Sequence, residues 1–127
     1  MSVFLKFTIE VDPARLEEFF KVQEKYLIPV NESLGLKLQG IFTEILGSVK
    51  PAVVEDLWEA ESLEHVMRIE NTKEYLTNPL WLKYVAVAKD VILSERLSIM
   101  SKVFGRMKCF YEPSTAEDAS RAHMFDV

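Results

Sequence analysis

Two residues near the middle of the sequence could carry acid–base chemistry, and the first is His65. It would be the third residue of a helix capped by Ser62, and a helix N-terminus disfavours a positive charge. The imidazole would then stay neutral and could accept a proton near pH 7, as a general base must. The alternative for His65 is an exposed residue of the first helical turn that has no role in chemistry.

The second candidate is Asp56, which lies two residues before Trp58 in an expected strand, so that both side chains share one face. If Trp58 points toward the helices, the Asp56 carboxylate lies at a pocket wall. Loss of water should raise its pKa unless Lys6 or Arg96 on a neighbouring strand pairs with it. Asp56 could then exchange a proton with His65; the alternative is a solvated or paired position near the strand edge.

Two other acids of this region have less direct interpretations. Glu55 faces the opposite way from Asp56, and we expect its charge to meet a cation or a backbone donor of a second copy of the chain. Glu44 shares a strand face with Phe42, and a structural role is at least as well supported as a catalytic one.

Six aromatic residues would surround the same interior. Flat rings stack on planar ligands, and tyrosine adds a directing hydroxyl group, so these residues suit a hydrophobic ligand; ordinary core packing is the alternative. They are Phe7, Tyr26, Trp58, Tyr75, Trp81 and Tyr84.

Other chemical signatures are missing from the sequence. It has no Gly-rich phosphate loop, nucleophile elbow or dinucleotide fingerprint. Cys109 is the only cysteine, and no Cys/His cluster provides metal ligands. We therefore expect neither a metal nor a cofactor.

The elements that must position these residues follow from hydrophobic periodicity. Strands are expected at 3–11, 36–46, 52–60 and 93–103, and helices at 13–34, bent at Pro29, at 63–77, and again after the interruption at 78–79. The order strand, helix, strand, strand, helix, strand predicts an α+β, ferredoxin-like antiparallel sheet with its helices on one face.

The other sheet face would carry an apolar patch. It should include Phe4, Met100 and either Ile41 and Ile45 or the residues that alternate with them. Water contact with such a patch is unfavourable, so we expect a homodimer in which two sheets pack into a dimeric α/β barrel.

Composition limits the class of protein. The 127 residues suit one domain at 1–104 with a tail at 105–127, and the tail contains a predicted short helix. A hydrophobic content of 49% argues against disorder, and a net charge of −5 argues against nucleic acid or an anionic membrane surface as partner. No membrane-spanning run or secretory signal is recognisable, and a lone cysteine suits the cytoplasm. The tail could be disordered, cover a pocket mouth or clasp the partner, and its aromatic residues favour docking.

The stretch "GIFTEILGSVKPAVVEDLW" from Gly40, followed by Ser62 and by "NPLW" at 78–81, resembles the NIPSNAP family of the dimeric α/β-barrel superfamily. The match runs from Val3 to about Val103. It departs from the family pattern at Leu46, which lengthens a Glu-to-Gly spacing, and at Ala60, where an aromatic residue commonly stands.

The resemblance implies homodimers with one pocket per subunit between the sheet and the helices. Relatives include cofactor-free monooxygenases acting on aromatic polyketides, cyclases and proteins without an established activity. Two hypotheses follow. The first is a cofactor-independent enzyme of specialised metabolism that cyclises, isomerises or oxygenates a hydrophobic, aromatic or polyketide-like substrate. The second is a non-catalytic homodimeric binding or scaffold protein.

Overall fold

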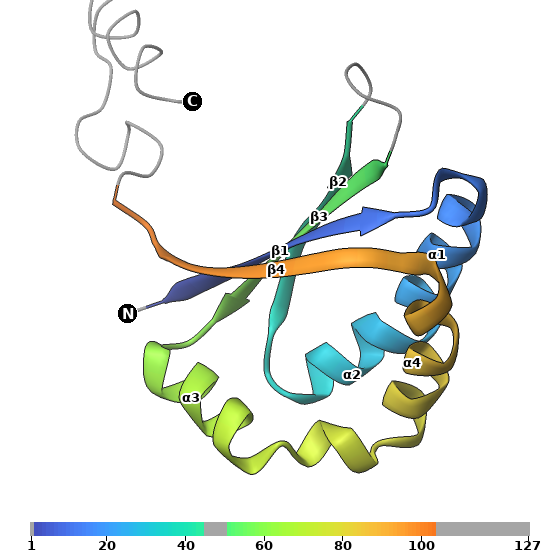
Figure 1. Ribbon diagram of the computed structural model, residues 1–127. Helices are drawn as coiled ribbons and strands as arrows, with labels where there is room; N and C mark the ends of the chain where they lie inside the picture. The colour runs from blue at the N-terminus through green and yellow to red at the C-terminus, as the bar shows by residue number, and fades with distance from the viewer. Residues whose placement is uncertain (1, 45–50, 104–127) are drawn as a thin grey trace, which may run out of the picture.

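The computed structural model describes residues 2–44 and 51–103, which form a four-stranded antiparallel sheet and its helices. The strands are β1 (Val3–Val11), β2 (Lys37–Thr43), β3 (Ala52–Ala60) and β4 (Ile92–Ser101), in the spatial order β2-β3-β1-β4. Figure 1 shows the helices gathered on one side of the sheet. This arrangement confirms the predicted α+β, ferredoxin-like fold.

The helices of the described residues form two regions. The first contains a 3₁₀ turn η1 (Pro13–Arg15), α1 (Leu16–Val22), a π-helical segment η2 (Gln23–Leu27) and α2 (Ile28–Ser33). The second contains α3 (Leu63–Thr72), a 3₁₀ turn η3 (Glu74–Thr77) and α4 (Pro79–Val91).

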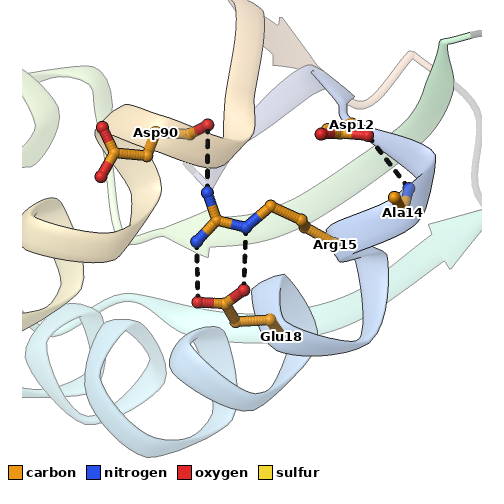
Figure 2. Close-up of polar contacts among 5 residues, drawn as sticks. All are labelled: Asp12, Ala14, Arg15, Glu18 and Asp90. Atoms are coloured by element: carbon orange, nitrogen blue, oxygen red, sulfur yellow. Dashed lines mark hydrogen bonds and ion pairs between the residues drawn. The ribbon is translucent and has the colours of Figure 1, made fainter.

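The first helical region begins at Pro13, as predicted, and Asp12 is its N-cap. The Asp12 carboxylate accepts a hydrogen bond of 3.0 Å from the backbone N–H of Ala14 (Figure 2). Arg15 donates two hydrogen bonds of 2.9 Å to the Glu18 carboxylate, and a longer one of 3.5 Å to the backbone carbonyl of Asp90. Arg15 therefore links the start of the first region to the end of α4.

The bend predicted at Pro29 takes the form of a π-helical turn. Proline has no backbone N–H to bond the carbonyl four residues earlier. In the turn before it, Ile28 donates its N–H to the Gln23 carbonyl, five residues back. Wide turns of this kind are frequent at functional sites. This one carries Gln23 and Leu27, both of which are buried.

The prediction of one helix at 63–77 is wrong, because two segments occupy this range. The N-cap at Ser62 is confirmed, since its hydroxyl accepts the backbone N–H of His65 at 3.1 Å. The helix ends early because Lys73 adopts a left-handed conformation with φ of 49°. The η3 turn follows, and Asn78 then caps α4.

The unbroken alternation predicted for the second strand is also wrong. The pairing of β2 with β3 shifts between Leu38 and Gly40, which breaks the alternation of faces. Leu38 and Ile41 consequently both pack against the buried core, and Phe42 turns to the outer face with 57% of its surface exposed. Its ring covers Gly40, where a Cβ atom would stand 2.7 Å from the ring. Ile45 lies outside the described residues.

The interior is divided into two clusters of buried side chains. The first joins β1 and β3 to α1, η2 and α4, and contains Ile9, Val54, Phe19 and Tyr84; the second joins the opposite ends of the strands to α3, and contains Leu5, Trp58, Ala60 and Val66. Phe7 is half-buried and packs against both clusters. The space beside Phe7 is therefore where the two parts of the core meet.

The outer sheet face combines apolar residues with one ion pair. Phe4 on β1 lies opposite Met100 on β4. Leu57 on β3 lies opposite Lys6, two residues after Phe4 on the same face of β1. The Lys6 ammonium group lies 3.4 Å from the Glu55 carboxylate. We expected Glu55 to meet a cation or a backbone donor of a second copy, and the structure shows that Lys6 of the same chain already supplies a cation.

The structure bears on two further features of the sequence, the tail and membrane-spanning segments. The predicted tail, 105–127, lies outside the described residues and so does its short helix. Within the part that the structure describes, no helix has both the length and the apolar character needed to cross a membrane.

Candidate functional site

A cavity of about 140 Å³ lies between the inner sheet face and the helices, where the two core clusters meet. Its floor is formed by β1 and β3, its walls by η2, α2, α3, η3 and α4, and its edge by β4. The polar or acidic residues that line it are Asn31, Asp56, Glu70, Tyr75, Trp81, Tyr84 and Glu95, and the remainder are apolar, including Leu5, Phe7, Ile9 and Leu97.

Asp56 is the most deeply buried charged group of the cavity, with 1% of its surface exposed. The Gln23 side-chain amide donates to both carboxylate oxygens, at 3.0 and 2.8 Å. The Trp58 indole N–H lies near the carboxylate and lowers the pKa of Asp56 by a small amount, but it forms no hydrogen bond of good geometry. Burial outweighs these donors, and together with the charge of Glu95 it raises the pKa of Asp56 to about 6.

Glu95 and Tyr84 complete a titratable group around Asp56. Asp56 is paired with Phe7, and Glu95 is paired with Ile9, so the two acids flank β1 on its inner face. Glu95 remains open to solvent at the sheet edge, and partial removal from water raises its pKa. Burial and then the charges of Glu95 and Asp56 raise the pKa of Tyr84, so its hydroxyl group stays protonated and can donate a hydrogen bond.

Three aromatic rings form one wall of the cavity. Tyr75 meets Trp81 edge to face with centroids 5.0 Å apart, and Trp81 lies 5.6 Å from Tyr84. Asn78 starts α4 and Lys73 ends α3, and these two helix ends bring Tyr75 beside Trp81. The early end of α3, which the sequence did not reveal, therefore builds this wall.

The predicted ligand-binding residues divide into two groups. Phe7, Tyr75, Trp81 and Tyr84 line the cavity. Tyr26 does not line the cavity: it is half-buried against the first core cluster, and the ammonium groups of Lys25 and Lys83 stand 5.5 and 5.9 Å from its ring centroid. Trp58 is fully buried in the second core cluster, next to the cavity and not in its lining.

His65 lies outside the cavity lining, and 6% of its surface is exposed. Its Nε2 atom is 2.7 Å from the Leu34 carbonyl oxygen, while Nδ1 accepts the backbone N–H of Glu61 at 3.3 Å. These partners assign the ring proton to Nε2. Both ring nitrogens are occupied by backbone groups, so the structure does not bring His65 together with Asp56.

Gly35 permits this arrangement of His65. It follows the first helical region, whose predicted end was residue 34, and has φ of 85°. A Cβ atom at Gly35 would lie 3.1 Å from the His65 ring. The imidazole therefore packs directly on the turn that leads into β2.

Sequence reasoning missed Gln23 and Glu95. Gln23 lies on the buried face of the first helical region, and a buried glutamine needs a polar partner, so it could have pointed to Asp56. Glu95 could have been found by register, because it shares a strand face with Leu97, and the two residues pair with Ile9 and Phe7 of the inner sheet face. Within residues 2–44 and 51–103, no three His, Cys, Asp or Glu side chains approach closely enough to hold a metal ion.

Solved structures provide the comparison with known proteins. A NIPSNAP family protein with unknown function from Agrobacterium tumefaciens aligns with 22% sequence identity over 90% of this chain and 94% of its own, with a TM-score of 0.67. An uncharacterised NIPSNAP-like domain protein from Burkholderia xenovorans aligns with 21% identity over 80% of this chain and 85% of its own, with a TM-score of 0.66.

A more distant match belongs to another group of the same fold. A putative antibiotic biosynthesis monooxygenase from Bacteroides thetaiotaomicron aligns with 18% identity over 81% of this chain and 90% of its own, with a TM-score of 0.55. No protein-family model and no curated protein matches the sequence. The chain therefore shares the fold of its NIPSNAP structural neighbours, as the resemblance in its sequence predicted, and that of antibiotic biosynthesis monooxygenase-like proteins.

Proposed function

We propose that the protein is a small cofactor-independent enzyme that moves a proton on a hydrophobic, ring-bearing substrate. Keto–enol isomerisation and aldol-type cyclisation both proceed through such a step. The observation that carries the proposal is Asp56, a carboxyl group that is almost fully buried at a cavity lined by aromatic rings. A carboxyl group with a pKa near 6 can accept and return a proton close to neutral pH.

In this proposal, Asp56 is the proton-carrying residue and Glu95 exchanges protons with solvent at the cavity edge. Tyr84 donates a hydrogen bond to the substrate, while Trp81 and Tyr75 pack against its ring. The small volume limits the enclosed part of the substrate to about one ring, since an apolar cavity of about 150 Å³ holds a benzene molecule. His65 and Trp58 support the fold around the site.

The test is hydrogen exchange at the carbon next to a carbonyl group, with phenylacetone in D₂O followed by ¹H NMR. We expect the wild type to accelerate exchange and Asp56→Asn to lower that acceleration about 100-fold or more, because the base is removed. Glu55→Gln is the matched control, since it removes the adjacent carboxylate on the opposite sheet face. Binding of phenylacetone without accelerated exchange would leave the alternative, a non-catalytic small-molecule-binding protein.

We also propose that the protein acts as a homodimer joined through the outer sheet face. The exposed ring of Phe42, together with Phe4, Leu57 and Met100, would leave an apolar surface in water. A second copy packed sheet to sheet would cover it with the same residues. We also propose a location in the reducing cytoplasm, because the sequence has a single cysteine, Cys109, and so provides no pair for a disulfide within the chain.

Native mass spectrometry of Leu57→Lys tests this interface. We expect a dimer for the wild type and a monomer for the variant, because two ammonium groups would be brought into the apolar contact. Leu82→Lys on α4 is the control, since Leu82 is already 57% exposed on the helical side. A monomeric wild type would contradict the interface.

A further inference from the structure

The polar groups of the cavity all carry one sign of charge or none. Asp56, Glu70 and Glu95 contribute carboxyl groups from three different elements, β3, α3 and β4. Among the described residues that line the cavity, none is Lys, Arg or His. The three acids of the cavity therefore have no cation beside them in the lining. Glu55 on the outer sheet face differs, because the Lys6 ammonium group lies 3.4 Å from its carboxylate.

Hydrogen-bond acceptors also exceed donors around Asp56. A carboxylate can accept about four hydrogen bonds. Within residues 2–44 and 51–103, Gln23 is the only side chain that donates to Asp56 with good geometry, through one nitrogen. Gln23 is itself fully buried, and its Oε1 atom has no donor among the described residues. An occupant of the cavity with N–H donors would satisfy the remaining acceptor positions of Asp56, which lines the cavity.

The aromatic wall suits the same kind of occupant. The faces of Trp and Tyr rings attract organic cations, and the attraction is stronger where water is excluded. Trp81 and Tyr84 are inclined at 39° to each other with centroids 5.6 Å apart, and both line the cavity across from the sheet that carries Asp56. Ring faces and carboxylates thus border one small space.

We propose that the occupant of the cavity is a small organic cation, a protonated amine attached to a single hydrophobic ring. This inference rests on the proposed function, because it names the substrate class for the same site. The ammonium group lies toward Asp56 and Glu95, and the ring packs between Phe7 and the Trp81 wall. Carboxylate or phosphate substrates are disfavoured, since they would face acids without a compensating cation.

A metal ion fits the cavity less well than an amine. The three acids do not approach one another closely enough to ligate one ion. The lining also contains apolar and aromatic side chains, and a bare metal ion would leave those surfaces without contacts. An amine with an attached ring uses both parts of the cavity.

Isothermal titration calorimetry with three probes of similar size tests the inference: 2-phenylethylammonium, 2-phenylethanol and phenylacetate. We expect the ammonium probe to bind the wild type at least tenfold more tightly than the alcohol, and phenylacetate to bind more weakly than either. In Asp56→Asn, the affinity for the ammonium probe should fall to the level of the alcohol, while the affinity for the alcohol stays unchanged. Glu55→Gln should behave as wild type.

Three results would overturn the inference. These are equal affinity of the wild type for ammonium and alcohol, preference for phenylacetate, and binding of none of the probes. The outcome is separable from that of the proposed function. Exchange of phenylacetone without preference for the ammonium probe would refute the amine class alone, whereas preference without exchange would support an amine-binding protein that is not an enzyme.

Discussion

His65 and Asp56 are both buried polar residues, but their surroundings differ. Both ring nitrogens of His65 are used by backbone groups, and its ring packs on Gly35. Asp56 receives hydrogen bonds from one side chain, faces a cavity and lies near a second acid, Glu95. The first is a saturated structural contact. The Asp56 carboxylate is a buried group with few hydrogen-bond donors, which is typical of a functional site.

The comparison predicts opposite effects of substitution on stability. His65→Ala should lower the free energy of unfolding by about 2–4 kcal/mol, because the Leu34 carbonyl and the Glu61 N–H lose their partner and the ring leaves a gap. Asp56→Asn should leave that free energy unchanged or raise it at pH 7. Urea denaturation followed by circular dichroism measures both. The comparison would fail if Asp56→Asn proved the more destabilising change.

A pH dependence of about 2–3 kcal/mol should separate wild type from Asp56→Asn. The pKa of Asp56 is raised by folding from 3.8 to about 6, so the folded protein binds the proton more tightly than the unfolded chain. This contribution to stability is present below pH 4 and is lost as the pH rises through 6. Tyr84 on α4 and Glu95 on β4 face the carboxyl group, and Gln23 on η2 is uncharged.

The measurement is the free energy of unfolding of both proteins at several pH values from 4 to 7. The wild type should lose stability relative to the variant across this interval. Glu55→Gln should follow the wild type, because its substitution leaves Asp56 in place. A constant difference between wild type and Asp56→Asn would show that the Asp56 carboxyl group is not desolvated.

A smaller effect is expected at the turn that His65 supports. Gly35→Ala should destabilise the protein by about 1–2 kcal/mol, because φ of 85° disfavours a side chain and the Cβ atom would press on the His65 ring. In the His65→Ala background the steric part should disappear, so the two changes should not add. Full additivity in a double-mutant cycle would contradict the contact.

Local sequence patterns predicted the parts of the molecule that depend on periodicity and caps. The strand at 52–60, the cap at Ser62, and the shared inner face of Asp56 and Trp58 follow from such patterns. These patterns also place Asp56 and four of the predicted aromatic residues at the cavity, but they do not give its complete lining, because that depends on register between strands distant in sequence. Glu95 reaches the site only through its pairing with Ile9.

Two backbone irregularities also escaped the periodic analysis. The left-handed conformation of Lys73 divides the second helical region and brings Tyr75 to the Trp81 ring. The shift in β2 after Leu38 exchanges the faces of Ile41 and Phe42. Glycine or proline usually marks such changes in a sequence. The left-handed residue is a lysine, and in β2 the nearest glycine, Gly40, comes directly after the shift.

The most direct test of the central claim is the titration of the Asp56 carboxyl carbon by ¹³C NMR, with and without 2-phenylethylammonium. We expect a midpoint near pH 6 in the free protein, in accordance with its buried position. Bound ammonium should lower that midpoint, because a nearby cation favours the carboxylate, whereas 2-phenylethanol should not. A midpoint near the ordinary value of 3.8, or one that the ammonium probe leaves unchanged, would contradict the assignment of Asp56 to a ligand-binding cavity.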